Sequence, residues 1–382
     1  MPAVSPRDAI APLDLTPVIN VSGAETAYGA SPVCPEVIAA IAALGPEWVD
    51  MRELRRAASD AIAGTFSCEA GAVAHCSAAG IALAIAGCMT GEDLPRIHQL
   101  PDTTGLRHEV VLPLAHDIDY GAPIRQNVAM TGARVVTVGS VSRCTAADLA
   151  AALTPRTAAA LFVVSHQVPP GDLIDVGTFC RTCREAGVPS IVDAAAEPDV
   201  RPFLAAGADL VITSAHKRLA SVTSAIVAGR AALVRACLAQ EAGLGRPMKA
   251  GKEALVGALA ALERWRRTDQ PAARAALEAR LVRGRERLAG VPGLAVNIAP
   301  DATSGLFSRL HIAVGPAAGL DAATLAARLR AGRPAIIVRE APGPGLLQLD
   351  FRHVSLETVD TVTEAIAATV AAARTGGAGG AR

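Results

Sequence analysis

Short apolar runs alternate with helical segments along the middle of the chain, between Ala72 and Gly229. The runs are nearly continuous in Val, Ile, Leu and Ala, as expected of strands that are covered on both faces. We predict strands at Val110–Leu114, Val135–Gly139, Ala160–Val164, Ser190–Asp193, Leu210–Ser214 and Ala225–Ala228. Alternation of this kind is typical of an α/β fold, in which crossover helices connect a mostly parallel sheet.

Helix signals fill the gaps between the predicted strands. Ala146–Leu153 follows Thr145, which is a favourable N-cap residue. Val176–Ala186 ends at Gly187, which tolerates a left-handed backbone. We interpret Ala70–Gly91 as an interior helix of small residues, because crossing a bilayer takes about 20 strongly apolar residues and this segment lacks them. No membrane segment is therefore expected.

The pattern changes after Gly229. Ala231–Arg267 is predicted to be helical apart from the polar segment GLGRPMKAGKE. A smaller α+β domain follows, with helices at Ala272–Leu288, Ala322–Ala331 and Leu356–Ala373 and strands at Leu294–Ile298, Leu306–Val314, Ala335–Arg339 and Leu346–Asp350. The expected parts are an N-terminal arm (1–25), a large domain (26–255), a small C-terminal domain (256–374) and a disordered, Gly-rich tail (375–382).

Charge and cysteine content narrow the function classes. The 382 residues carry 36 Lys and Arg against 36 Asp and Glu, so neither nucleic acid nor membrane is an expected partner. The N-terminus lacks the basic start and apolar run of a signal peptide, and eight scattered cysteines favour free thiols in the cytoplasm. Cys180 and Cys183 share a predicted helix face without a second ligand pair, so we predict packing there and no metal site.

The most informative residues are Asp193, at the end of a predicted strand, and Lys217, which follows the next strand 24 residues later. Both are expected in the crevice at the carboxyl ends of the strands, where open α/β sheets bind ligands. Such a pair suits pyridoxal 5'-phosphate (PLP). The carboxylate keeps the pyridine nitrogen protonated, while the amine forms a Schiff base and moves the substrate's α-proton. Taken alone, Asp193 could be an ordinary aspartate at a strand end, and Lys217 could be an ordinary surface lysine. Their order and spacing together favour binding of the cofactor.

Seven segments carry a family resemblance: VINVSGAETAYGAS, VDMRELRRAAS, AGCMTGED, LPDTTGLRHEVV, IVDAAAEPD, GADLVITSAHK and GLGRPMKAGKEALVGALAALERW. They resemble the selenocysteine-synthase-like group of fold-type-I PLP enzymes, and within it most of all the D-glucosaminate-6-phosphate ammonia-lyase branch. The resemblance runs from about Val18 to Trp265. It implies an aspartate-aminotransferase-like fold with a large cofactor domain and a small C-terminal domain. It also implies a homodimer or larger oligomer with active sites at subunit interfaces.

The resemblance assigns cofactor roles to five residues. Lys217 matches the Schiff-base lysine, and Asp193 matches the partner of the pyridine nitrogen. Cys76 and Ser77 lie in the loop before a helix, where backbone amides would cradle the cofactor phosphate. His116 falls where related enzymes place a residue that stacks on the cofactor ring. A lone histidine is also compatible with a satisfied loop position, and that alternative stays open.

The resemblance places further residues around the cofactor and substrate. Arg339 matches a residue that binds the substrate carboxylate bidentately. Arg246 and Lys249 suit a phosphate or carboxylate of the substrate, although they fit a solvated basic loop equally well. His166 is expected on the substrate side, and Arg125 is expected to belong to the scaffold. The remaining predicted cofactor contacts are Ser214, His216 and Thr223.

Two loops depart from the family pattern. Relatives commonly have a Gly-Pro-Gln-Ser-Ser type of turn after the lysine, whereas this chain has Ala220–Ser224. The hydroxyls of Ser221, Thr223 and Ser224 keep phosphate contact feasible. The phosphate loop with His75 and Cys76 is also unusual. These departures concern the substrate and the cofactor phosphate rather than the fold.

The resemblance therefore predicts a PLP-dependent lyase for a small anionic amino acid or amino-sugar acid. Removal of the α-proton and loss of a β-hydroxyl would give a 2-keto acid and ammonia. Selenium transfer to seryl-tRNA is an alternative. Zero net charge disfavours it, and so does a length that is not expected to accommodate the extra N-terminal tRNA-binding domain of those enzymes. Racemase or aldolase chemistry begins from the same carbanion. A non-catalytic scaffold is the alternative outside enzymes.

Overall fold

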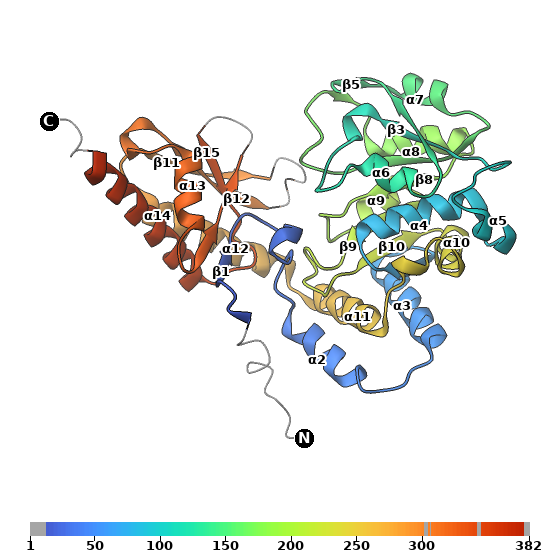
Figure 1. The fold of residues 1–382 in the computed structure, drawn as a ribbon, viewed down its shortest axis with the longest axis horizontal. Helices are drawn as coiled ribbons and strands as arrows, with labels where there is room; N and C mark the ends of the chain where they lie inside the picture. Colours follow the sequence, from blue (N-terminus) through green and yellow to red (C-terminus); the bar gives the residue numbers. More distant parts are fainter. Residues whose placement is uncertain (1–12, 302–304, 306, 342–344, 378–382) are drawn as a thin grey trace. The chain divides into compact units, whose positions relative to one another are not determined.

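The computed structural model describes residues 13–301, 305, 307–341 and 345–377. The chain forms two compact units (Figure 1). The large unit is Ser31–Thr268, and the small unit combines the described parts of Met1–Ala30 and Asp269–Arg382. No helix in these described ranges is long and apolar enough to cross a membrane.

A seven-stranded sheet forms the centre of the large unit, with the order β2–β10–β9–β8–β6–β3–β4. Its strands are β2 (Ala70–Ala74), β3 (Glu109–Pro113), β4 (Arg134–Val138), β6 (Thr157–Val163), β8 (Ser190–Asp193), β9 (Leu210–Ser214) and β10 (Ala225–Gly229). All neighbours pair in parallel except β10, which is antiparallel to β2 and β9. The six predicted strands and the mostly parallel sheet are therefore confirmed. The carboxyl ends of every strand but β10 meet at one edge.

The prediction of one helix over Ala70–Gly91 is wrong at its start, because Ala70–Ala74 is strand β2 and only Ser77–Thr90 is helix α4. Small residues permit both structures, and pairing with β10 decides for the strand. Gly71 also lets helix α3 (Met51–Phe66) approach, since a Cβ there would lie 2.1 Å from Ile62 Cγ2.

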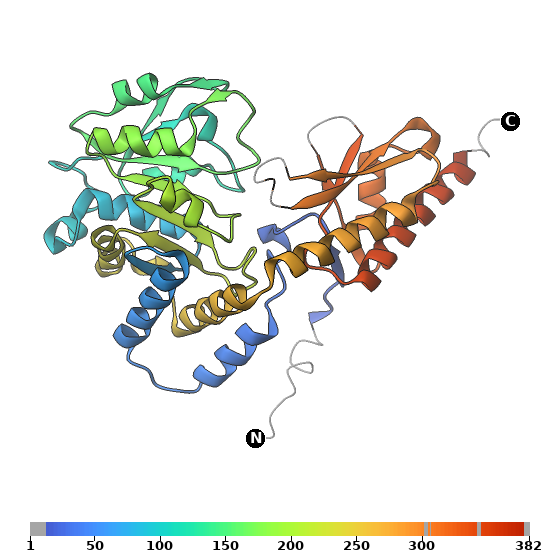
Figure 2. The same ribbon diagram turned by 180° about the vertical axis from the view of Figure 1, so that it is seen from behind.

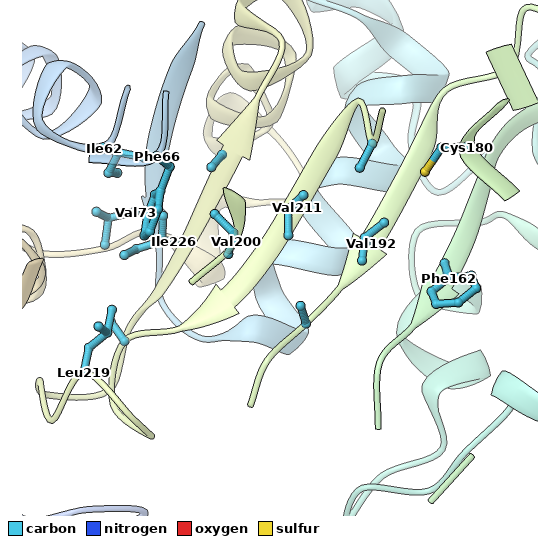
Figure 3. Close-up of a cluster of buried hydrophobic side chains, with 14 of the residues drawn as sticks. Ile62, Phe66, Val73, Phe162, Cys180, Val192, Val200, Val211, Leu219 and Ile226 are labelled. Atoms are coloured by element: carbon cyan, nitrogen blue, oxygen red, sulfur yellow. The ribbon is translucent and has the colours of Figure 1, made fainter. Parts of the chain in front are cut away.

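Helices cover both faces of the large sheet, as the alternation of strand side chains requires. Val73, Ile226, Val211 and Val192 project toward one face, which is covered by α3, α8 (Val176–Glu185) and α11 (Lys252–Arg267) (Figures 2 and 3). α4 and α10 (Ala231–Ala239) cover the opposite face. The other elements of this unit are α2 (Pro35–Leu44), α5 (Leu94–Gln99), α6 (Ile124–Ala129), α7 (Ala146–Ala152), α9 (Arg201–Ala205), η3 (Leu114–His116), η4 (Gln240–Ala242), η5 (Arg246–Met248), β5 (Arg143–Cys144) and β7 (Asp172–Leu173).

Local signals for two helices are confirmed. Thr145 caps α7 through a reciprocal capping box with Asp148. Gly187 follows α8 with a φ of 67°. Cys180 and Cys183 on α8 are fully buried free thiols, in agreement with the predicted packing role.

The small unit is an α+β structure. Its four-stranded antiparallel sheet has the order β11–β12–β15–β14. Its elements are β11 (Leu294–Pro300), β12 (Ser308–Val314), β13 (Ala335–Ile337), β14 (Arg339–Glu340), β15 (Leu346–Leu349), α12 (Gln270–Leu288), α13 (Ala322–Arg330), α14 (Leu356–Gly377) and η6 (Pro316–Ala318). The N-terminal segment adds η2 (Thr26–Tyr28) and β1 (Val18–Asn20), which pairs in parallel with β13.

The unit boundaries differ from the predicted domain boundaries. The predicted boundary at 255/256 falls inside α11, whose continuous hydrogen bonding carries the large unit to Thr268. The predicted arm (1–25) joins the small unit because β1 pairs with β13. α14 continues to Gly377, past the predicted start of the tail, while residues 1–12 and 378–382 lie outside the described residues.

Close packing of α4 on α10 is expected to set the position of α4. A Cβ on Gly87 would lie 3.0 Å from backbone atoms of Ala236 and Cys237. Gly87→Val should therefore lower the free energy of unfolding by about 1–3 kcal/mol, measured by urea denaturation of the cofactor-free protein. Gly64→Ala is the matched control, because Gly64 also lies inside a helix but has open space beside it. It should be neutral or stabilising by up to about 1 kcal/mol. Equal losses in the two variants would contradict the close approach.

Candidate active site

Side chains of the predicted site gather at the carboxyl edge of the large sheet. β8 ends at Asp193, β9 ends at Ser214, and β6 ends at Val163. β2 leads into the start of α4, and the antiparallel β10 begins at the same edge. The topology therefore brings together loops that are far apart in the sequence.

Asp193 and Lys217 lie within electrostatic range of each other at this edge. Asp193 is 6% exposed, and burial raises its pKa to about 6 although the Lys217 charge opposes this shift. Its Oδ1 accepts a hydrogen bond of 3.2 Å from the Ala195 amide. Burial lowers the pKa of Lys217, with the Asp193 charge opposing. A partly desolvated amine beside a carboxylate is suited to act as nucleophile and base.

Lys217 is one of only three lysines in the chain, the others being Lys249 and Lys252. Lys249 is exposed. Lys252 donates hydrogen bonds of 2.6 and 2.7 Å to the carbonyl oxygens of Gly45 and Glu47. Lys217, by contrast, is largely buried beside the Asp193 carboxylate.

Several hydrogen bonds fix the turn that carries Lys217. The Ser31 hydroxyl donates to the His216 carbonyl oxygen at 2.7 Å. Ser214 Oγ and His216 Nδ1 are 3.0 Å apart, and burial lowers the pKa of His216. Ala220 has a φ of 58°, a left-handed conformation that glycine adopts without strain. An alanine in this conformation costs about 1 kcal/mol.

Cys76, Ser77 and the backbone amides at the start of α4 form a polar site next to this turn, which we call the phosphate cradle. Cys76 is the N-cap residue, and its Sγ accepts a hydrogen bond of 3.5 Å from the Ala79 amide. Ser77 Oγ is buried and has no hydrogen-bond partner among the residues the structure describes. A helix N-terminus with free amides and an unused hydroxyl is suited to bind a phosphate group.

His116 is held in place by the neighbouring strand. Its Nδ1 accepts a hydrogen bond of 3.1 Å from the Val163 amide, and its ring meets Phe162 edge-on with centroids 4.4 Å apart. The imidazole is 2% exposed, and burial lowers its pKa to about 4, so the ring is neutral at physiological pH. Stacking of this ring on the cofactor stays a prediction.

Tyr120 was not predicted from the sequence as a site residue. Asn127 donates a side-chain hydrogen bond to the Tyr120 hydroxyl, and the residue is 39% exposed. Partial burial together with the charges of Asp193 and Cys76 raises its pKa to about 12. Tyr120 is therefore within electrostatic range of both the predicted pyridine partner and the phosphate cradle. Its position four residues after His116, on the same loop, is the one sequence signal for it.

The loop that carries Arg246 and Lys249, which we call the basic loop, lies beside the phosphate cradle. The Met248 carbonyl oxygen accepts a hydrogen bond of 3.3 Å from the His75 amide, next to Cys76. Arg246 and Lys249 flank this contact and are exposed, so both are free to reach an anion in solution.

The remaining predicted residues are more dispersed. His166 and Thr223 lie in exposed turns at the same sheet edge, after β6 and before β10. Arg125 pairs with Asp117, as expected of a scaffold residue. Arg339 begins β14 in the small unit and is half-buried. Burial and the neighbouring Arg309 lower its pKa.

The large unit fits PLP. Asp193 supplies a buried carboxylate, Lys217 supplies a partly desolvated amine, and the start of α4 supplies an unused Ser77 hydroxyl. These groups match the three polar ends of the cofactor, namely its pyridine nitrogen, aldehyde and phosphate. The fold and the site together define an enzyme of the fold-type-I class with PLP as its cofactor.

Comparisons with known proteins identify the family. The chain is 38% identical over 360 residues to 5'-C-glycyluridine monooxygenase-decarboxylase of a Streptomyces species, covering 92% of this chain and 89% of the relative. It is 34% identical over 345 residues to D-glucosaminate-6-phosphate ammonia lyase of Salmonella typhimurium, covering 90% and 92%. The protein belongs to the family of PLP enzymes that contains these two relatives. No family model matches the sequence.

Solved structures support the same family assignment. The structure of D-glucosaminate-6-phosphate ammonia-lyase has a TM-score of 0.87 at 32% identity, with 98% of this chain and 100% of that chain covered. A serine palmitoyltransferase structure with PLP has a TM-score of 0.60 at 16% identity over 93% and 88% of the chains, which supports the fold alone.

The raised pKa of Asp193 gives the cofactor-free protein a specific pH dependence. A carboxyl whose pKa rises from 3.8 to about 6 on folding stabilises the protein below pH 3.8, and this contribution is lost as the pH rises through 6. Wild-type protein should therefore lose about 2 kcal/mol relative to Asp193→Asn between pH 4.5 and 7.5. Urea unfolding of both proteins across this range measures the difference. A difference that stays constant with pH would show that Asp193 does not titrate in this window.

Proposed function

We propose that the protein is a lyase that converts an amino acid or amino-sugar acid with a β-hydroxyl into a 2-keto acid and ammonia. The observation that carries the proposal is the Asp193–Lys217 pair at the sheet edge, in a chain related along nearly its whole length to an ammonia lyase. The intact pair also argues against a non-catalytic scaffold.

The residues of the site have separate tasks in this reaction. When bound, PLP supplies an electron sink that stabilises negative charge on the substrate's α-carbon. Asp193 holds the proton on the pyridine nitrogen that makes this sink effective. Lys217, whose pKa is lowered by burial, removes the α-proton with its amine. The β-hydroxyl leaves as water, and hydrolysis of the resulting enamine consumes one water and releases ammonia and the 2-keto acid.

An anionic substrate accounts for the cationic residues. Arg339 would bind the substrate carboxylate in bidentate fashion. Arg246 and Lys249, beside the phosphate cradle, would bind a second anionic group such as the phosphate of an amino-sugar acid. His166 and Thr223 would line the substrate and cofactor sides of the same edge.

We further propose that the enzyme works as a homodimer or larger oligomer in the cytoplasm, and that its family belongs with the selenocysteine-synthase-like group. Eight free cysteines support a reducing compartment. Zero net charge disfavours selenium transfer to a tRNA.

A second candidate function is oxidative decarboxylation, because a monooxygenase-decarboxylase is related along the same length of chain. This reaction also needs negative charge to be stabilised on the α-carbon, so Asp193 and Lys217 would serve both. The two candidates differ in their other reactants and products. A monooxygenase consumes O2 and a decarboxylase releases CO2, whereas the lyase reaction neither consumes O2 nor releases CO2.

The functional test is a product assay on the PLP-loaded enzyme. β-Hydroxy amino acids of both α-configurations, D-glucosaminate and its 6-phosphate are offered with and without O2. We expect ammonia and 2-keto acid in equal amounts and independent of O2. Release of CO2 with O2 consumption would replace this function with the second candidate, and racemised or cleaved substrate would indicate racemase or aldolase chemistry.

Lys217→Ala and Lys252→Ala are the matched variants for this assay. Lys217→Ala should lose the visible absorbance of the lysine-bound cofactor and at least about a thousandfold in turnover. Lys252→Ala removes a lysine that donates hydrogen bonds to the Gly45 and Glu47 carbonyl oxygens, and it should keep the absorbance. Retention of both properties by Lys217→Ala would remove Lys217 from the mechanism.

The basic loop gives a separate prediction about the substrate. Lys249→Met and Arg246→Met should each raise KM for a phosphorylated substrate about tenfold or more, the effect of losing a charge-assisted hydrogen bond. The same substrate without its phosphate is the control and should show little change. Steady-state kinetics with both substrates makes the comparison, and equal effects on the two would argue that the loop is merely solvated.

A further inference from the structure

The loop after β8 is joined to the last three residues of β9. The Ala194 amide donates to the Ile212 carbonyl oxygen at 2.8 Å, and the Ser214 amide donates to the Ala195 carbonyl oxygen at 3.3 Å. The Thr213 hydroxyl donates to the Glu197 carbonyl oxygen. The first of these segments begins at Asp193 and the second leads directly to Lys217.

A charged pair closes this connection. Arg218, the residue after Lys217, places Nη1 3.4 Å from Glu197 Oε2 and 3.4 Å from the Ala196 carbonyl oxygen. The side chains of Arg218 and Glu197 are only 16% and 6% exposed. Removing one partner of a buried pair is strongly unfavourable, because the other charge stays buried with less compensation. Glu197 and Arg218 therefore hold the two loops in one arrangement.

We infer that Glu197 and Arg218 are a positioning pair that sets the placement of the Lys217 amine relative to the Asp193 carboxylate. Each member lies close in sequence to the residue it positions, with Glu197 four residues after Asp193 and Arg218 one residue after Lys217. The inference rests on the cofactor roles of Asp193 and Lys217 and not on which product leaves. It is therefore independent of the choice between lyase and oxidative decarboxylase.

The pair also balances charge around Lys217. Asp193 and His216 lie within electrostatic range of Lys217, and Arg218 is its neighbour in the chain. One step further out, His75 lies within range of His216, and Tyr120 lies within range of Asp193. Glu197 neutralises Arg218 in this group. Removing Glu197 leaves an additional cation near the amine, and removing Arg218 leaves an additional anion. The two removals should therefore shift the protonation of Lys217 in opposite directions.

The test is chemical labelling of Lys217 in the cofactor-free protein as a function of pH. With only three lysines in the chain, peptide mass spectrometry resolves Lys217 from Lys249 and Lys252 after reaction with an amine reagent. Glu197→Gln should lower the pH midpoint of Lys217 labelling by about half a unit, and Arg218→Gln should raise it by a similar amount. The double variant should return close to the wild-type midpoint.

A kinetic readout on the loaded enzyme accompanies the labelling. Each single variant should lose about tenfold to a hundredfold in kcat with a smaller change in KM, because a misplaced amine slows proton transfer rather than binding. The double variant should regain no kcat despite its restored labelling midpoint, since the connection between the loops is still absent.

Glu197→Asp and Arg218→Lys keep both charges and are used if a neutral variant does not fold. Each should keep the wild-type midpoint of Lys217 labelling and still lose kcat.

Arg230→Gln is the matched control. It breaks the 3.1 Å ion pair between Arg230 and Asp209 at the opposite end of β9 and β10. This variant should leave both the Lys217 midpoint and kcat unchanged. If the Glu197 and Arg218 variants likewise change only the melting temperature, the pair is structural and the inference is overturned.

Discussion

A carboxylate buried at the end of a central strand is the constraint on which the site depends. Burial of Asp193 penalises its charge, and such a group persists only beside a positive partner. Lys217 is that partner in the protein without cofactor, and a protonated pyridine nitrogen is suited to be the partner when PLP is bound. The sheet makes this exchange feasible, because β8 and β9 are parallel neighbours and release both residues at the same edge.

Most of the sheet was predictable, because its strands are short continuous apolar runs with a single compatible structure. Ala70–Ala74 was not, since a run of Ala and Gly has no periodicity that separates strand from helix, and only pairing with β10 decides. The boundary between the two compact units lies later in the chain than the predicted domain boundary, for a related reason. α11 continues as regular helix across the predicted boundary, and nothing in its composition marks the end of a domain.

The site also contains residues that could be predicted from the sequence and residues that could not. Asp193 and Lys217 were identifiable because strand ends and cofactor chemistry together restrict where such residues stand. Tyr120 was not, because its nearness to Asp193 and Cys76 depends on the path of a loop that has no sequence motif. Glu197 belongs to a segment that carries the family resemblance, and Arg218 directly follows another. A charged residue in a loop is normally solvated, and only their low exposure distinguishes these two.

The pairing of β1 with β13 joins residues from near the two ends of the chain. The large unit, by contrast, is one contiguous segment, Ser31–Thr268. During synthesis on the ribosome the large unit is released whole and can fold while the small unit is still incomplete. β1, near the start of the chain, can then pair only after β13 has been synthesised. Until it pairs, Val21, which is fully buried in the finished small unit, remains available to solvent and to chaperones.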